Sequence, residues 1–222
     1  LKINPNTKTC PRFENNTEKK ITSKIYDGLP VLINEEENEN PWGIEYHRMY
    51  DMTTDSELFE DNTLESLQNK GYDLQDNSTF TNSKRDYDYY PLYEAKFIQQ
   101  FDHRFGTFED IPREQRLGRK AETKNPSPEE KSDPDKEIVP RYWICEKDFE
   151  NRYDELDWGR DWIFAFRGIT NTRNFRTAVG TITPFVPHGN SAPVITFDRG
   201  QNTTDEALVF TSLFNSFVFD FT

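Results

Sequence analysis

The chain has 222 residues, of which 40 are Asp or Glu and 27 are Lys or Arg, so its formal net charge at pH 7 is −13. This balance excludes a surface that attracts nucleic acid everywhere and leaves room only for a local basic face on an acidic protein. An aromatic share of 14% beside a hydrophobic share of 33% predicts an aromatic core with long polar loops, and no apolar run reaches the ~20 residues of a membrane-spanning helix.

The two cysteines indicate a reducing compartment. Cys10 and Cys145 lie far apart in the sequence and belong to no metal-binding motif. We therefore expect a cytoplasmic protein with reduced cysteines. The chain starts at Leu1 and stops within an apolar segment at Thr222, so we expect it to be part of a longer protein.

Short elements and acidic loops alternate in the first part of the chain. Helices are expected at 15–26, in a short stretch through Phe59 and at 62–69, and strands at 31–33 and 42–52. Residues 73–88 are polar and lack periodicity, which predicts an exposed loop.

Residues 89–105 alternate aromatic and cationic side chains. We expect a helix at 92–99 followed by a strand at 100–108. Candidates for contacts with nucleic acid in this stretch are Lys96, Gln100, His103 and Arg104. Aromatic faces stack on bases and cations bind phosphates, which favours this interpretation. An aromatic core strand with charged edges fits the pattern equally well.

A segment rich in proline and charge separates two parts of the chain. Residues 113–138 contain almost no apolar side chains, which predicts a flexible linker or excursion. The flanking parts, 1–112 and 139–222, are expected to form one compact unit.

Strands and helices follow closely after this segment. Strands are predicted at 140–144, 162–166, 178–183 and 191–197, and helices at 146–152 and 204–219. The mixed order of elements indicates the α+β class, with a small mixed sheet, flanking helices and one long flexible excursion.

A polar loop joins the two strongly apolar strands at 162–166 and 178–183. Its side chains suited to phosphates and base edges are Arg167, Thr170, Asn171, Arg173, Asn174, Arg176 and Thr177. Guanidinium groups bind phosphates or guanine edges, and amide groups pair with adenine in bidentate fashion. An ordinary hairpin with solvated arginines is the alternative, because loops are usually polar without any functional reason.

Five short sequence motifs follow one another along the chain, and their order is more informative than any one of them alone. They are Ile3-Asn4-Pro5-Asn6-Thr7; Pro91-Leu92-Tyr93-Glu94-Ala95-Lys96 with Phe101-Asp102-His103-Arg104; Pro140-Arg141-Tyr142-Trp143; Phe166-Arg167-Gly168-Ile169-Thr170 with Arg176-Thr177; and Asn215-Ser216-Phe217-Val218-Phe219-Asp220. This ordered set resembles the region that follows the catalytic domain in large adenine-specific DNA methyltransferases of restriction-modification and phage-defence systems, including fused methylase-endonucleases. The resemblance spans residues 3–220 and implies a target-recognition-domain-like fold that binds double-stranded DNA.

The resemblance also implies which functions lie outside this chain. The family's S-adenosylmethionine loop and its Asn-Pro-Pro-aromatic motif, which holds the flipped adenine, have no counterpart here. Asn40-Pro41-Trp42, for example, lacks the second proline. We therefore expect no catalytic residue, metal site or cofactor in this chain, and S-adenosylmethionine in a missing methyltransferase domain that would be its partner. The family's helix after Asn215 usually continues into Arg-Gln-Lys, which this chain does not reach.

Two other functions stay open. The acidic balance suits a protein-interaction module that docks a partner subunit. Asp102 and His103 together suit a small metal-dependent nuclease, because such an enzyme needs an acid and a base beside a divalent ion.

Overall fold

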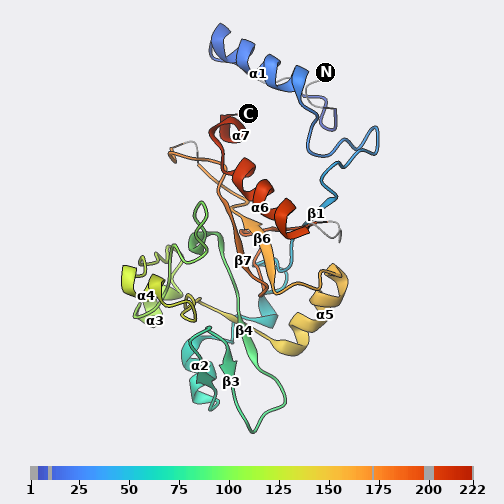
Figure 1. Ribbon diagram of the computed structural model, residues 1–222. Coiled ribbons are helices and arrows are strands. Elements are labelled where there is room, and N and C mark those ends of the chain that lie inside the picture. Colours follow the sequence, from blue (N-terminus) through green and yellow to red (C-terminus); the bar gives the residue numbers. More distant parts are fainter. Residues whose placement is uncertain (1–4, 10–11, 172, 198–202, 222) are drawn as a thin grey trace.

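The computed structural model describes residues 5–9, 12–171, 173–197 and 203–221 (Figure 1). Ile3, Asn4 and Cys10 lie outside the described residues, whereas Cys145 is a free, partly exposed thiol. The helices are α1 (Asn16–Gly28), η1 (Ser56–Leu58), α2 (Leu64–Asn69), η2 (Ala95–Phe97), α3 (Arg113–Arg116), α4 (Pro128–Ser132), α5 (Glu146–Leu156), α6 (Thr203–Phe214) and α7 (Phe217–Phe221). Among the described residues, no helix combines the length and the apolar character needed to cross a bilayer.

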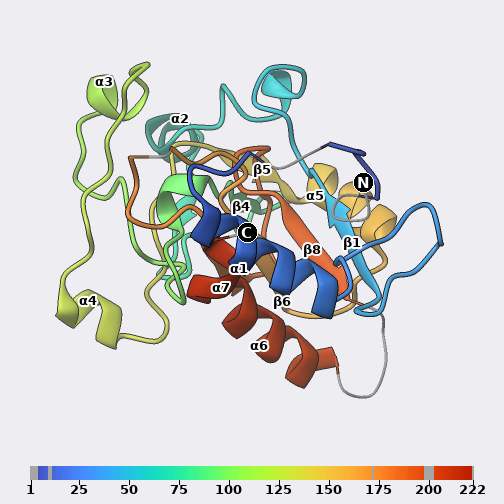
Figure 2. The same cartoon turned by 90° about the horizontal axis from the view of Figure 1, so that it is seen from above.

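A four-stranded antiparallel sheet lies beside α6. Its strands, in spatial order, are β1 (Ile44–His47), β8 (Val194–Phe197), β6 (Trp162–Phe166) and β7 (Gly180–Pro184). The rings of Phe210 and Phe214 on α6 contact the ring of Phe164 on β6, with centroid distances of 5.1 and 5.2 Å. Figure 2 shows α6 lying alongside β6 and β8. Burying each such ring contributes about 1.5–3 kcal/mol, so this layer is a firm support for the loop that joins β6 to β7.

A second four-stranded antiparallel sheet is built from other parts of the chain. Its strands are β2 (Asp73–Leu74), β3 (Phe80–Thr81), β4 (Tyr89–Pro91) and β5 (Trp143–Cys145). The buried rings of Phe80 and Trp143 pack edge to face at 5.0 Å, and the Trp143 indole donates a 2.7 Å hydrogen bond to the Ser78 carbonyl. Because β4 precedes residues 113–138 and β5 follows them, the two flanking parts of the chain share this sheet.

These elements confirm the α+β class predicted from the sequence. The strands form two antiparallel sheets, where one small mixed sheet was expected. β6 has the predicted bounds, and α1, α2, α5, β7 and β8 differ from the prediction by only a few residues at their ends.

The two polar stretches of the first part differ from their predictions. Residues 73–88 contain β2 and β3, although they were expected to be one loop. Residues 31–33, expected to be a strand, form none in the structure. An isolated antiparallel bridge joins Asn34 and Glu39 directly after them. The extended strand expected at 42–52 is reduced to β1.

The aromatic stretch also folds differently from the prediction. Only η2 is helical within 92–99, and a tight turn replaces the strand expected at 100–108. In this turn the Gln99 amide donates to the Asp102 carbonyl at 2.7 Å, and Phe101 has a φ of +59°. A long-range bond from the Tyr93 amide to the Pro187 carbonyl, 2.8 Å long, holds the start of the stretch. Contacts between distant parts of the chain therefore override the local pattern.

The long helix predicted at 204–219 is interrupted at Asn215. Its side-chain amide accepts a 3.1 Å hydrogen bond from the Gly180 amide and donates a 2.8 Å bond to the Gly180 carbonyl. The side chain thus pairs with the first residue of β7 as a neighbouring strand would. The chain then resumes as α7.

Residues 113–138 are held against the rest of the molecule. The Arg104 guanidinium donates to the carbonyls of Lys131, Asp133 and Lys136 at 2.6–2.7 Å. Arg116 is 2% exposed, and its guanidinium donates to both carboxylate oxygens of Glu65 in α2. The flexibility predicted for this segment stays a prediction, but these contacts connect it to the body of the protein.

Gly180 occupies a position with no room for a side chain. A Cβ there would lie 2.5 Å from Phe164 Cζ and 3.1 Å from Phe214 Cδ1. We expect Gly180→Ala to lower the free energy of unfolding by about 2 kcal/mol in urea denaturation, because the packed rings must shift. Gly28→Ala is the control, since a Cβ at Gly28 meets nothing within 4 Å. Equal stability of the two variants would contradict this account.

Candidate nucleic-acid interface

The loop between β6 and β7 is anchored where it leaves β6. The Arg167 amide donates to the Val179 carbonyl at 2.9 Å, and Arg167 Nε donates to the Ile98 carbonyl at 2.8 Å. The guanidinium also lies 5.8 Å from the centroid of the Phe105 ring. Burial lowers the pKa of Arg167, although a guanidinium stays charged in proteins. Arg167 therefore holds the loop to the turn that follows η2.

The loop is anchored again where it enters β7. Oδ1 of Asp220 accepts from the Thr177 amide at 2.7 Å, the Thr177 hydroxyl at 2.6 Å and the Ala178 amide at 2.6 Å. Oδ2 of Asp220 accepts from Arg176 Nε at 2.5 Å. Arg176 also donates to the Asn215 carbonyl at 2.7 Å and lies 4.4 Å from the Phe217 ring centroid. The carboxylate of Asp220 on α7 thus binds three successive residues at the end of the loop.

The tip of the loop projects beyond these anchors beside α7 (Figure 1). Asn171 Oδ1 accepts from the Arg173 amide at 2.9 Å, and the Asn171 carbonyl accepts from the Asn174 amide at 2.8 Å. Asn171, Arg173 and Asn174 are exposed, and Thr170 is partly exposed. In the described part of the loop, the Arg173 guanidinium makes no hydrogen bond or ion pair. The tip therefore offers amide and guanidinium donors to an outside partner.

Large apolar side chains accompany these donors. Ile169 is 83% exposed and Phe175 is 92% exposed, on the two arms of the same loop. Such exposure is unusual for residues of this size in a chain whose other rings mostly pack together. A phenylalanine within a polar loop is visible in the sequence. Phe175 was not predicted as a contact residue, because only side chains that bind phosphates or base edges were candidates in this loop.

The turn after η2 lies directly beside the base of the loop. Gln100 Nε2 donates to the Ala178 carbonyl at 3.2 Å and to the Asn215 carbonyl at 3.4 Å. The next residue, Phe101, donates its amide to the Gly180 carbonyl at 3.3 Å and exposes 63% of its surface. Two stretches that the sequence suggested separately, 89–105 and 167–177, thus meet at one place.

Lys96 belongs to a different contact. Its Nζ donates to the Ala121 carbonyl at 3.0 Å and lies 5.1 Å from the centroid of the Phe108 ring. Burial lowers the pKa of Lys96, and the nearby Glu94 carboxylate only partly offsets this. Lys96 is therefore tied to the segment around Ala121 and not to the loop.

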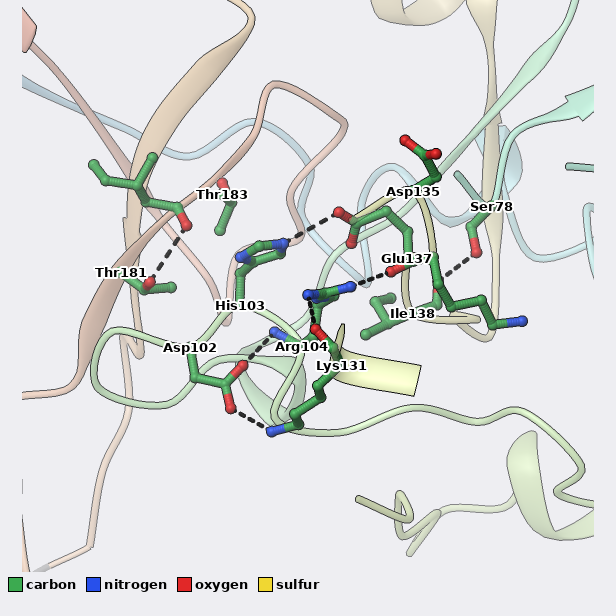
Figure 3. Close-up of polar contacts among 12 residues, drawn as sticks. Ser78, Asp102, His103, Arg104, Lys131, Asp135, Glu137, Ile138, Thr181 and Thr183 are labelled. Atoms are coloured by element: carbon green, nitrogen blue, oxygen red, sulfur yellow. Dashed lines mark hydrogen bonds and ion pairs between the residues drawn. The ribbon is translucent and has the colours of Figure 1, made fainter. Parts of the chain in front are cut away.

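His103 and Arg104 lie among partners from residues 131–137 (Figure 3). His103 Nε2 lies 3.1 Å from Oε1 of Glu137, whose other oxygen accepts a 2.7 Å bond from the Tyr93 hydroxyl. Burial opposes ionisation of Glu137, but the His103 and Tyr93 hydrogen bonds lower its pKa. The donors of Arg104 are used by the three backbone carbonyls described above.

Asp102 and His103 do not share a partner. Asp102 accepts from Lys131 Nζ at 2.5 Å and from the Arg104 amide at 2.8 Å, whereas His103 meets Glu137 (Figure 3). In the part of the chain that the structure describes, no group of three His, Cys, Asp or Glu side chains is arranged to hold a metal ion. The arrangement gives the nuclease hypothesis no geometric support.

The structure therefore divides the predicted contact residues into two groups. Exposed at the loop tip are Asn171, Arg173 and Asn174, with Thr170 partly exposed. Engaged in contacts within the chain are Arg167, Arg176, Thr177, Lys96, Gln100, His103 and Arg104.

No family model, curated protein or solved structure matches this chain.

Proposed function

We propose that this chain is the DNA target-recognition region of a cytoplasmic adenine-specific methyltransferase or restriction-modification enzyme. One observation carries the proposal: a loop fixed at both ends projects Asn171, Arg173 and Asn174 into solvent. Amide and guanidinium groups held on a firm support are suited to read base edges, because little ordering is required on binding. The ordered resemblance to the post-catalytic region of such methyltransferases supports the same conclusion.

The proposal assigns different roles along the loop. Arg173 would bind a phosphate or a guanine edge, and Asn171 and Asn174 would pair with adenine. Thr170 would add a smaller contact. Arg167 and Arg176, whose guanidinium groups bind Ile98, Asn215 and Asp220, would position the tip without contacting DNA themselves.

The acidic total of −13 fits a division of labour within a longer enzyme. Neutralising phosphates requires many cations, and this loop offers few. In the proposed enzyme, most of the phosphate contacts, the S-adenosylmethionine and the adenine pocket belong to the methyltransferase domain. This chain would then supply sequence recognition of double-stranded DNA.

Arg173→Ala tests the proposal. We expect it to weaken binding to a randomised pool of duplexes at low salt by about tenfold, and to reduce the slope of log K against log salt by about one. Fluorescence anisotropy of labelled duplexes measures both quantities. Arg160→Ala is the matched control, because Arg160 is exposed at the opposite end of β6. Salt-dependent binding that both variants keep unchanged would contradict the proposed role of the loop.

A second candidate function is that of a protein-interaction module. The outer side of α6 and α7 exposes between 46% and 72% of Leu208, Val209, Leu213, Phe217, Val218 and Phe221. Large apolar side chains exposed in such number on two successive helices are typical of protein contacts. In the main proposal the methyltransferase domain would cover it; in the alternative, a partner subunit would. Methylation or restriction that survives Arg173→Ala but is lost in Leu213→Glu would favour the alternative.

A further inference from the structure

Two phenylalanines protrude where the loop meets the turn after η2. Phe175 exposes 92% of its surface and Phe101 exposes 63%. By contrast, Phe164, Phe210 and Phe214 form a buried cluster of contacting rings. Neither protruding ring adds much to the apolar burial that stabilises the fold.

The two protruding residues belong to one location. The Asn215 carbonyl accepts a bond from Gln100 Nε2 at 3.4 Å and another from Arg176 Nη2 at 2.7 Å. Phe101 follows Gln100 in the chain, and Phe175 precedes Arg176. The side chains that neighbour the two exposed rings in the sequence therefore meet at a single carbonyl group.

Phe101 also has an unfavourable backbone conformation. Its φ of +59° lies in the left-handed region, which glycine adopts easily and a bulky residue adopts at a cost. Hydrogen bonds of the flanking residues impose this conformation, since Gln99 and Asp102 pair with each other across the turn. A strained and exposed aromatic residue does not serve stability, which is typical of a functional position.

We propose that Phe101 and Phe175 stack on bases of locally unstacked duplex DNA. The inference rests on the proposed DNA recognition and adds the state of the DNA that the site selects. Apolar side chains enter base steps and unstack them, and aromatic rings stack on bases of any sequence. Arg173 and Asn174 next to Phe175 supply polar groups that a duplex can bind, which favours DNA over an apolar protein surface.

The test compares two duplexes of the same sequence, one intact and one with a central abasic site, where stacking is already broken. We expect the whole chain at low salt to bind the abasic duplex about tenfold more tightly, a difference of about 1.4 kcal/mol. Phe101→Gly and Phe175→Ala should each reduce this preference severalfold. Neither should lower the melting temperature, because the first relieves the positive φ and the second removes an exposed ring.

Ile169→Ala is the matched control, since Ile169 is 83% exposed on the same loop but has no ring. It should keep the preference for the abasic duplex. Salt-dependent binding without any preference, or equal loss in Ile169→Ala, would overturn the stacking role and leave the proposed DNA recognition intact. Absence of salt-dependent binding to both duplexes would overturn the recognition function itself.

Discussion

Asp220→Ala is expected to lower the free energy of unfolding by about 3 kcal/mol, because it removes the acceptor that holds the end of the loop. The side chains of Asp220 and Arg176 are each only 12% exposed, so solvent replaces the lost contact poorly. The change leaves the Arg176 guanidinium without its counter-charge and the amides of Thr177 and Ala178 without an acceptor. Urea unfolding followed by tryptophan fluorescence measures the loss.

Loss of this anchor should also weaken DNA binding by about tenfold, because the released loop must be ordered again when it binds. Asp220→Asn keeps an acceptor oxygen and should lose roughly half as much stability. Asp205→Ala, which removes an exposed acid of α6, should change stability by less than about 0.5 kcal/mol. If Asp220→Ala and Asp205→Ala were equally stable, the carboxylate would not be the anchor.

The pH dependence of stability offers an independent check on Asp220. Burial opposes its ionisation, but hydrogen bonds from Thr177, Ala178 and Arg176 lower its pKa from 3.8 to about 2. The stability that this carboxylate contributes is therefore fully present above about pH 4 and is lost as the pH falls through about 2. In Asp220→Asn the free energy of unfolding should decline less steeply across that interval.

Local sequence patterns predicted the elements whose stability depends on their own apolar periodicity. β6 was predicted with its observed bounds, and a helix was predicted where α6 lies. The apolar stripe expected on that helix is mostly exposed, because α6 packs on the sheet through Phe210 and Phe214. The interruption at Asn215 was not predictable, because it depends on an amide pairing with Gly180, 35 residues earlier. The turn at Phe101 was missed for a similar reason, since nothing in a phenylalanine indicates a positive φ.

The sequence singled out the loop between β6 and β7 as a candidate, but it did not indicate which of its arginines are held by contacts within the chain. Arg167, Arg173 and Arg176 look equivalent in the sequence, yet only Arg173 projects into solvent. Arg167 is held by the Ile98 carbonyl, and Arg176 is held by Asp220, 44 residues later in the chain. No local pattern connects either arginine to its partner. Composition identifies a polar loop, whereas the groups that bind its arginines are known only from the folded structure.

Glu94→Ala is expected to have the largest effect on stability, a loss of about 3–5 kcal/mol, because it leaves a charge buried without its partner. Glu94 is 5% exposed and binds Arg141 through both carboxylate oxygens, one of them 2.8 Å from Arg141 Nε. Burial opposes the charge of Arg141, yet the carboxylate holds its pKa above the usual value. The Arg141 side chain is only 17% exposed, and its guanidinium lies 5.8 and 5.6 Å from the ring centroids of Phe108 and Tyr142, so solvent replaces the lost carboxylate poorly.

A second substitution separates the cost of the lone charge from the value of the pair. Glu94→Leu combined with Arg141→Met should recover much of the stability that Glu94→Ala loses, because apolar groups of similar size replace a buried pair at little cost. Glu129→Ala, at an exposed position of α4, should change the free energy of unfolding by less than about 0.5 kcal/mol. Urea denaturation of the variants decides the matter. A double variant no more stable than Glu94→Ala would show that the ion pair contributes net stability of its own, since removal of both charges would then bring no relief.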